Sequence, residues 1–150
     1  MAEVIYRDED ETYYQRRKVG NQTIELGINF YTETDNNCKS WWNIYITIFN
    51  KRKDMYSNMY KKIITGKNPI ATVLNAREMF NEVEKYVISY ELTNGNYDEL
   101  TIFCTWVDNR RRDVYYKVLS RLGYDWGRLP SGEKCIMKTY LLEEETNEKN

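Results

Sequence analysis

The chain has 150 residues, of which 41% are hydrophobic and 30% charged, a balance typical of a soluble globular domain rather than of a disordered segment. The 22 basic and 23 acidic residues nearly cancel, so the overall charge does not predict a nucleic-acid or anionic-membrane partner. Histidine is absent, which excludes a Ser–His or Cys–His catalytic pair within the chain and removes the commonest zinc ligand.

The N-terminus and the cysteines predict a cytoplasmic protein, in a bacterium or an infected host cell. Residues 1–11 are acidic and lack the apolar core of a signal peptide, and no apolar run is long enough to cross a membrane. Cys38, Cys104 and Cys135 are odd in number and widely spaced, which predicts neither a disulfide framework nor a metal site. The 14 tyrosines, with frequent Asn and Lys, are compatible with an AT-rich genome such as that of a phage.

The first third of the chain predicts antiparallel strands. A short strand is expected at 4–6 and a second at 12–19, which Gly20-Asn21 ends with a turn signal. Residues 23–32 alternate, and their apolar side chains share one face: Ile24, Leu26, Ile28 and Phe30.

Residues 40–50 (SWWNIYITIFN) form the most strand-like segment, after a polar loop at 33–39. Both faces of this segment are apolar, which predicts a central strand covered on both sides. A second extended piece is expected at 60–65. Asn68-Pro69 then caps a helix that runs to about Tyr90. Its predicted core stripe is Ile70, Val73, Leu74, Phe80, Val83 and Val87.

The remainder predicts a strand at 99–107, a helix from Asp108 or Asn109 to Leu122, and a hairpin at 124–142. We expect the helix to bury Val114, Val118 or Leu119, and Leu122. Residues 143–150 are polar and predicted to be a frayed tail. The order indicates one α+β domain over 1–142, with a central mixed, mostly antiparallel sheet flanked by two main helices.

Residues 99–142 resemble the GNAT N-acetyltransferase fold. In that family a strand leads into a helix that ends in a YxKxGF-like phrase, and a β-hairpin follows. Here the strand is ELTIFCTWVDN, the phrase is Leu119-Ser120-Arg121-Leu122-Gly123-Tyr124, and the hairpin is YDWGRLPSGEKCIMKTYL. The match identifies the chain as similar to a degenerate GNAT domain. It implies a sheet whose central strands splay apart near Phe49 and Cys104 to hold a pantetheine arm.

The resemblance also implies a site for acetyl-CoA or another acyl-CoA at the first turn of the long helix. The family binds pyrophosphate on a glycine-rich turn there, where free N–H groups and the helix dipole hold the anion. The corresponding residues are Thr65, Gly66, Lys67 and Asn68. This turn has a single glycine, and Pro69 removes one N–H donor, so an ordinary capping turn is the competing interpretation.

For catalysis the resemblance implies a tyrosine that protonates the leaving thiolate, four residues before the motif glycine. That position is Leu119; Tyr115 lies one turn earlier on the same helix face, with Tyr116 beside it, and either could reach the thioester only if the helix were shifted. Glu25 and Glu33 are candidates for the general base. Residues 7–22 are too strand-like to supply the helices that form the family's acceptor site, so those helices are expected to be reduced or missing.

Two hypotheses stay open. The chain is an acyl-CoA-dependent N-acyltransferase with an amine acceptor, or it is a non-catalytic GNAT-like module, for example a small phage protein that binds and inhibits a host or defence protein. The abundant aromatic residues leave room for one exposed aromatic patch, the usual anchor of a protein interface. A basic helix face is interpreted as solvated rather than as a phosphate grip: Arg110, Arg111, Arg112, Lys117 and Arg121.

Overall fold

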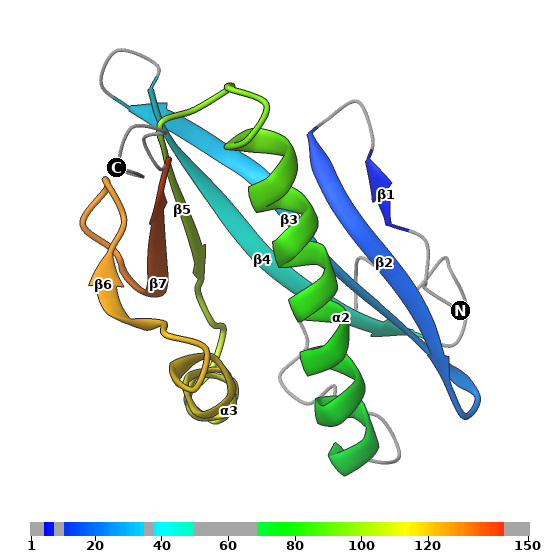
Figure 1. Ribbon diagram of the computed structural model, residues 1–150. Helices are drawn as coiled ribbons and strands as arrows, with labels where there is room; N and C mark the ends of the chain where they lie inside the picture. The colour runs from blue at the N-terminus through cyan, green and yellow to red at the C-terminus, as the bar shows by residue number, and fades with distance from the viewer. Residues whose placement is uncertain (1–4, 8–10, 35–37, 50–68, 143–150) are drawn as a thin grey trace.

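A computed structural model describes residues 5–7, 11–34, 38–49 and 69–142, and the predicted α+β fold with a mixed sheet and two main helices is confirmed (Figure 1). The strands are β1 (Tyr6–Arg7), β2 (Thr12–Val19), β3 (Gln22–Thr34), β4 (Lys39–Phe49), β5 (Glu99–Cys104), β6 (Asp125–Arg128) and β7 (Lys134–Leu141). The helices are α2 (Pro69–Glu91) and α3 (Asn109–Ser120).

The seven strands form one sheet in the order β1-β2-β3-β4-β5-β7-β6. Every neighbouring pair is antiparallel except β4 and β5, which are parallel and joined through α2. The element order is therefore the one that the resemblance implies, with β7 between β5 and the edge strand β6. The predicted tail at 143–150 and the extended piece at 60–65 lie outside the described residues.

The strand patterns in the sequence locate the sheet well. Gly20 closes the β2–β3 hairpin with a φ of +65°, a conformation that glycine adopts without steric cost. Strand β3 is longer than the segment predicted at 23–32. Its polar end continues to pair with β4 through Glu33 and Thr34. Strand β4 lies between β3 and β5, as its two apolar faces predict.

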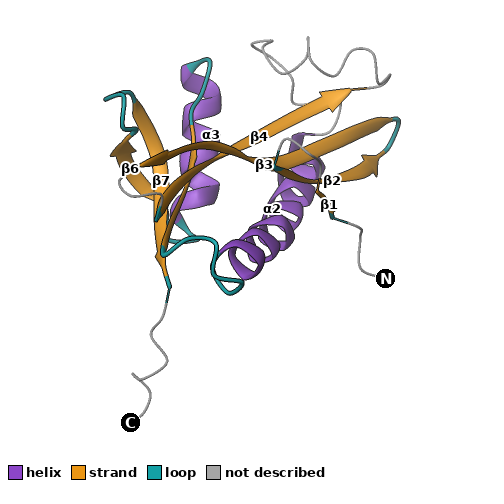
Figure 2. Ribbon diagram, turned by 90° about the horizontal axis from the view of Figure 1, so that it is seen from above, coloured by secondary structure: helices purple, strands orange, loops and turns teal. Residues whose placement is uncertain are grey.

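Helix α2 covers one face of the sheet, which we call the helix face (Figure 2). The main core forms there between the strands and both helices, with the buried residues Ile24, Trp42, Val83, Ile102, Leu119 and Ile136 among its members. A smaller cluster of Phe103, Leu129 and Cys135 lies on the opposite face, and no helix of the described residues contributes to it.

The predicted stripe of α2 is wrong at its start. Ile70 is 75% exposed and Leu74 is 50% exposed, whereas Thr72 and Met79 are buried. The side of the helix that meets the sheet runs through Thr72, Met79, Val83 and Val87, so Ile70 and Leu74 point away from it. Two apolar side chains near the N-terminal end of α2 therefore remain exposed.

Helix α3 begins where the sequence places it. Asp108 is the N-cap, and its Oδ1 accepts a hydrogen bond from the Arg111 N–H at 2.8 Å. The helix ends at Ser120, two residues before the predicted end, and Gly123 follows with a φ of +94°. Leu119 is its buried residue, and Val114, expected in the core, is 38% exposed. Among the described residues, no helix has the length and apolarity of a membrane span.

Candidate functional site at the divergence of β4 and β5

The parallel strands β4 and β5 pair over only part of their length. Lys39 to Asn43 pair with Glu99 to Phe103, after which β4 continues to Phe49 while β5 ends at Cys104. Figure 1 shows the two strands running apart beyond this point, with α2 in front of them. We call the region beyond the Asn43–Phe103 pair the β4–β5 opening. It matches the splayed central strands that the resemblance implies.

Tyr115 lies beside the end of β5. Its ring packs against the main core, and burial raises the pKa of its hydroxyl to about 12, with Arg111 lowering the pKa and the nearby Cys104 and Asp108 raising it. Within the described residues the hydroxyl has no hydrogen-bond partner. A phenol with this pKa keeps its proton at neutral pH, so Tyr115 has the protonation state of a general acid.

The family's tyrosine position, Leu119, is filled by an apolar side chain that is 6% exposed and belongs to the main core. It has no proton to donate. Tyr116 stacks on Trp126 with its hydroxyl 3.4 Å from Asp125 Oδ1, so of the two tyrosines considered as proton donors Tyr115 is the better placed.

Glu25 lies on the other face of the sheet. Its neighbours Ile24 and Leu26 point into the core under α2, so Glu25 points away from the helices. Its Oε1 accepts from Arg16 Nε at 2.6 Å and its Oε2 accepts from the Tyr45 hydroxyl at 2.7 Å. The structure does not bring Glu25 and Tyr115 together, and both carboxylate oxygens of Glu25 are occupied.

The second base candidate, Glu33, is also engaged. It is an exposed residue near the end of β3, and its Oε1 accepts from the Tyr97 hydroxyl at 3.1 Å. Burial and this contact raise the pKa of Tyr97. Neither glutamate is presented as an unpaired base, and their catalytic roles stay predictions.

The residues predicted to bind the acyl-CoA pyrophosphate, Thr65, Gly66, Lys67 and Asn68, lie outside the described residues. The helix that follows begins at Pro69, as predicted. The exposed Ile70 and Leu74 mark its first two turns as an apolar surface.

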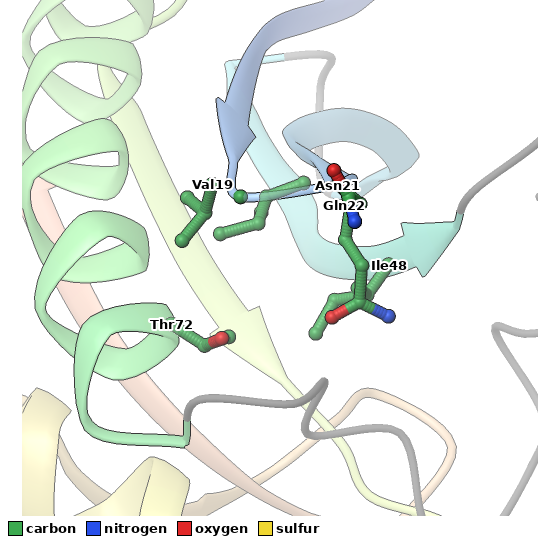
Figure 3. Close-up of a pocket in the computed structure, with 7 residues that line it drawn as sticks. Val19, Asn21, Gln22, Ile48 and Thr72 are labelled. Atoms are coloured by element: carbon green, nitrogen blue, oxygen red, sulfur yellow. The ribbon is translucent and has the colours of Figure 1, made fainter.

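A pocket of about 250 Å³ lies between the β2–β3 hairpin, the end of β4 and the first turn of α2 (Figure 3). Ile24 and Ile48 provide apolar walls, and Asn21, Gln22 and Thr72 provide polar groups. None of the described residues that line it is charged. Beyond the Gly20-Asn21 turn, no local pattern predicts this pocket, because its walls come from four separate elements.

The three cysteines do not form a reactive site. Burial raises the pKa of the Cys104 thiol far above its ordinary value and raises that of Cys135 to about 11. A hydrogen bond with Asp98 raises the pKa of the exposed Cys38. Such thiols stay protonated and weakly nucleophilic at neutral pH. Within the described part of the chain no group of His, Cys, Asp and Glu could hold a metal ion.

Comparisons with known proteins give little further help. No protein-family model matches the sequence, and no curated protein is significantly similar to it. Among solved structures, the fold is similar to the N-terminal domain of a ribosomal-protein-alanine acetyltransferase from Clostridium acetobutylicum ATCC 824, at 8% identity and a TM-score of 0.43. The similarity covers 92% of this chain and 95% of that one. At this TM-score the two folds agree only loosely, so the similarity assigns neither family nor activity.

Proposed function

We propose that the chain is a GNAT-like N-acyltransferase that binds acetyl-CoA or another acyl-CoA at the β4–β5 opening. The observation that carries the proposal is the coincidence of three features. Two parallel central strands separate after the Asn43–Phe103 pair, and a protonated tyrosine without a hydrogen-bond partner among the described residues, Tyr115, lies at the end of β5. The start of α2, the element that crosses between these strands, exposes Ile70 and Leu74.

These features suit a long ligand with an anionic end and an apolar arm. The N-terminal turn of α2 carries the positive end of the helix dipole, which favours a pyrophosphate. The preceding residues, Thr65 to Asn68, would complete that cradle. Strand β4 continues beyond Asn43 after its pairing with β5 has ended, so the space between the two strands widens along the course that a pantetheine arm would take.

Tyr115 would act at the leaving sulfur. In the proposed reaction the amine nitrogen bonds to the acyl carbon, the carbon–sulfur bond breaks, and the sulfur takes the Tyr115 proton. The proton lost by the amine returns to the phenolate through solvent. Because Glu25 and Glu33 are both engaged, the amine must arrive neutral or lose its proton to water rather than to either carboxylate.

Isothermal titration of the chain with acetyl-CoA and with free CoA tests the proposal. We expect saturable binding that Gly66→Asp abolishes, because a carboxylate would repel the pyrophosphate. Tyr115→Phe should preserve binding and slow acyl transfer by about 10²-fold or more, the usual contribution of a general acid. An absence of binding heat, with thermal stability unchanged by millimolar ligand, would contradict the proposal.

The second candidate is a non-catalytic module of the same fold that acts by protein contact. Leu119 in place of the family's tyrosine, and the engagement of both candidate bases, favour it. A cytoplasmic phage-encoded inhibitor of a host or defence protein is one form that it could take. The titration distinguishes the two candidates, since a module of this kind need not bind a CoA thioester.

A further inference from the structure

The most exposed tryptophan of the described residues lies on a preformed aromatic stack. Trp126, at the second position of the edge strand β6, is 47% exposed. Tyr116 of α3 stacks on its indole with ring centroids 4.4 Å apart and an interplanar angle of 8°. Trp106, which follows β5, meets the same indole edge-on at 5.7 Å. We call Trp106, Tyr116 and Trp126 the aromatic ledge.

The ledge is rigid and is not explained by burial alone. Two rings fix the position of the indole, yet almost half of the Trp126 surface remains open to solvent. An indole held in this way loses little conformational freedom when another flat group stacks on it. Exposed aromatic side chains of this kind are the usual platform for unpaired nucleobases.

Cations lie on the same face of the hairpin as Trp126. Side chains alternate along a strand, so Arg128 points to the same face as Trp126, and the register pairs Arg128 with Lys134. Arg128 is oriented by a hydrogen bond from its Nη1 to the Gly132 carbonyl oxygen at 2.8 Å, and Lys134 makes no ion pair within the described residues. Two positive groups therefore lie beside the exposed Trp126 ring, on the side toward the hairpin turn.

Helix α3 adds positive charge on the other side of the ledge. Arg112 lies one turn before Tyr116 and pairs with the exposed Asp113 at 3.0 Å, while Lys117 is adjacent to Tyr116 and has no such partner among the described residues. Residues 105–142 hold eight basic and four acidic residues, a net charge of +4, whereas the whole chain carries −1. The overall balance thus conceals a basic region around the ledge.

The acidic groups of this region are already counted in its net charge of +4, so they reduce the positive charge without cancelling it. Asp125 is next to Trp126, but its Oδ1 already accepts the Trp126 N–H at 2.8 Å and lies 3.4 Å from the Tyr116 hydroxyl oxygen. The backbone N–H of Trp126 therefore already has an acceptor, which argues against a partner that adds a strand to this edge of the sheet. A flat group on the ring with phosphates on the flanking cations fits the surface better.

From this arrangement we infer that the aromatic ledge binds single-stranded nucleic acid, with a base stacked on Trp126 and phosphates on Arg128 and Lys134. The inference does not depend on acyl-CoA binding, because none of the three ledge side chains is given a role in the proposed acyl transfer. It also bears on the interpretation of the α3 cations as a solvated face, since Arg112 lies one turn before Tyr116 on that helix.

Fluorescence anisotropy with labelled single-stranded RNA and DNA of about 12 nucleotides tests this inference, a length within the range that one small binding fold covers. We expect saturable binding at low salt and a loss of affinity of about ten-fold in Trp126→Ala, in line with one lost base stack. Tyr31→Ala is the matched control, because Tyr31 is also 47% exposed but lies on β3, away from the ledge. It should bind like the unchanged chain.

The double variant Arg128→Ala/Lys134→Ala covers the case in which Trp126→Ala fails to fold. It should weaken binding and lower the slope of log affinity against log salt by about 1.4, the value for two lost phosphate contacts with a single strand. Three outcomes would overturn the inference: no binding of either oligonucleotide at low salt, a loss of affinity in Trp126→Ala that is as large for base-free heparin as for the oligonucleotides, or full binding by the folded double variant. The first of these would leave the ledge to a protein partner.

Discussion

At the scale of single residues, tyrosine hydroxyls partner the carboxylates of a chain that has no histidine. Tyr13 donates to Glu91, Tyr45 to Glu25, and Tyr124 to Glu84, and in each pair at least one residue is buried. The Tyr45–Glu25 pair has a steric requirement as well. A Cβ on Gly27 would lie 2.4 Å from the Tyr45 ring, so the ring occupies the space that glycine leaves.

Gly27→Ala should therefore destabilise the fold by about 1–3 kcal/mol, the usual cost of inserting a group into a packed site. The Tyr45 ring cannot move without giving up its hydrogen bond to Glu25. Urea unfolding measures the loss. Gly127→Ala is the control: its Cβ would meet the Met137 sulfur at 2.3 Å, but methionine is flexible and can turn aside. An equal loss in both variants would contradict the role given to Tyr45.

At the scale of elements, Glu84 ties α2 to the C-terminal part of the sheet. Its Oε2 accepts from Tyr124, between α3 and β6, and from Tyr140 on β7. Phe80, one turn earlier on α2, packs against the Tyr124 ring with centroids 5.7 Å apart. These contacts hold the helix against the β5 side of the β4–β5 opening.

Glu84→Ala should lower the free energy of unfolding by about 1–3 kcal/mol, because the buried Tyr124 hydroxyl then loses its acceptor. Thermal or urea unfolding checks the value. Lys85→Ala, at the exposed neighbouring position, should stay within about 0.5 kcal/mol of the unchanged chain. If the two substitutions cost the same, Glu84 is not the tie between these elements.

Local patterns were enough to predict most helices and strands. They failed where contacts between distant segments determine which side chains are buried or paired. The Gly20-Asn21 turn, the Asp108 cap and the alternation in β3 are local signals, and each is found as expected. The exposure of Ile70 and Leu74 depends on which side of α2 meets the sheet, which periodicity alone does not fix. The hydrogen bonds that Glu25 accepts and the stacking of Trp126 on Tyr116 join residues from different elements, so no local pattern predicts them.

At the scale of the whole molecule, several buried acids are held in their neutral form. Burial raises the pKa of Tyr115 to about 12 and of Cys135 to about 11, and it also raises those of Tyr97, Tyr124, Tyr140 and Cys104. A group whose pKa is higher in the folded state contributes stability below its unfolded pKa and loses it as pH rises toward the folded value.

The ordinary pKa values of these groups are 9.0 for cysteine and 10.0 for tyrosine, so their contribution to stability should be constant below about pH 9 and be lost as the pH rises above it. Urea unfolding under reducing conditions at a series of pH values measures this. Cys104→Ala should make the loss of unfolding free energy less steep in the lower part of this pH range, and Tyr115→Phe should do so in the upper part. A free energy of unfolding that is constant up to pH 11 would contradict the assigned burial.

The central claim, that an acyl-CoA occupies the β4–β5 opening, is tested most directly by hydrogen–deuterium exchange with and without acetyl-CoA. We predict slower exchange of backbone amides in β4 beyond Asn43 and in the segment from Cys104 to Tyr115, with the β6–β7 hairpin unchanged. Protection confined to Val19–Gln22 would place the ligand in the pocket of Figure 3 instead, and no protection anywhere at saturating ligand would contradict the claim.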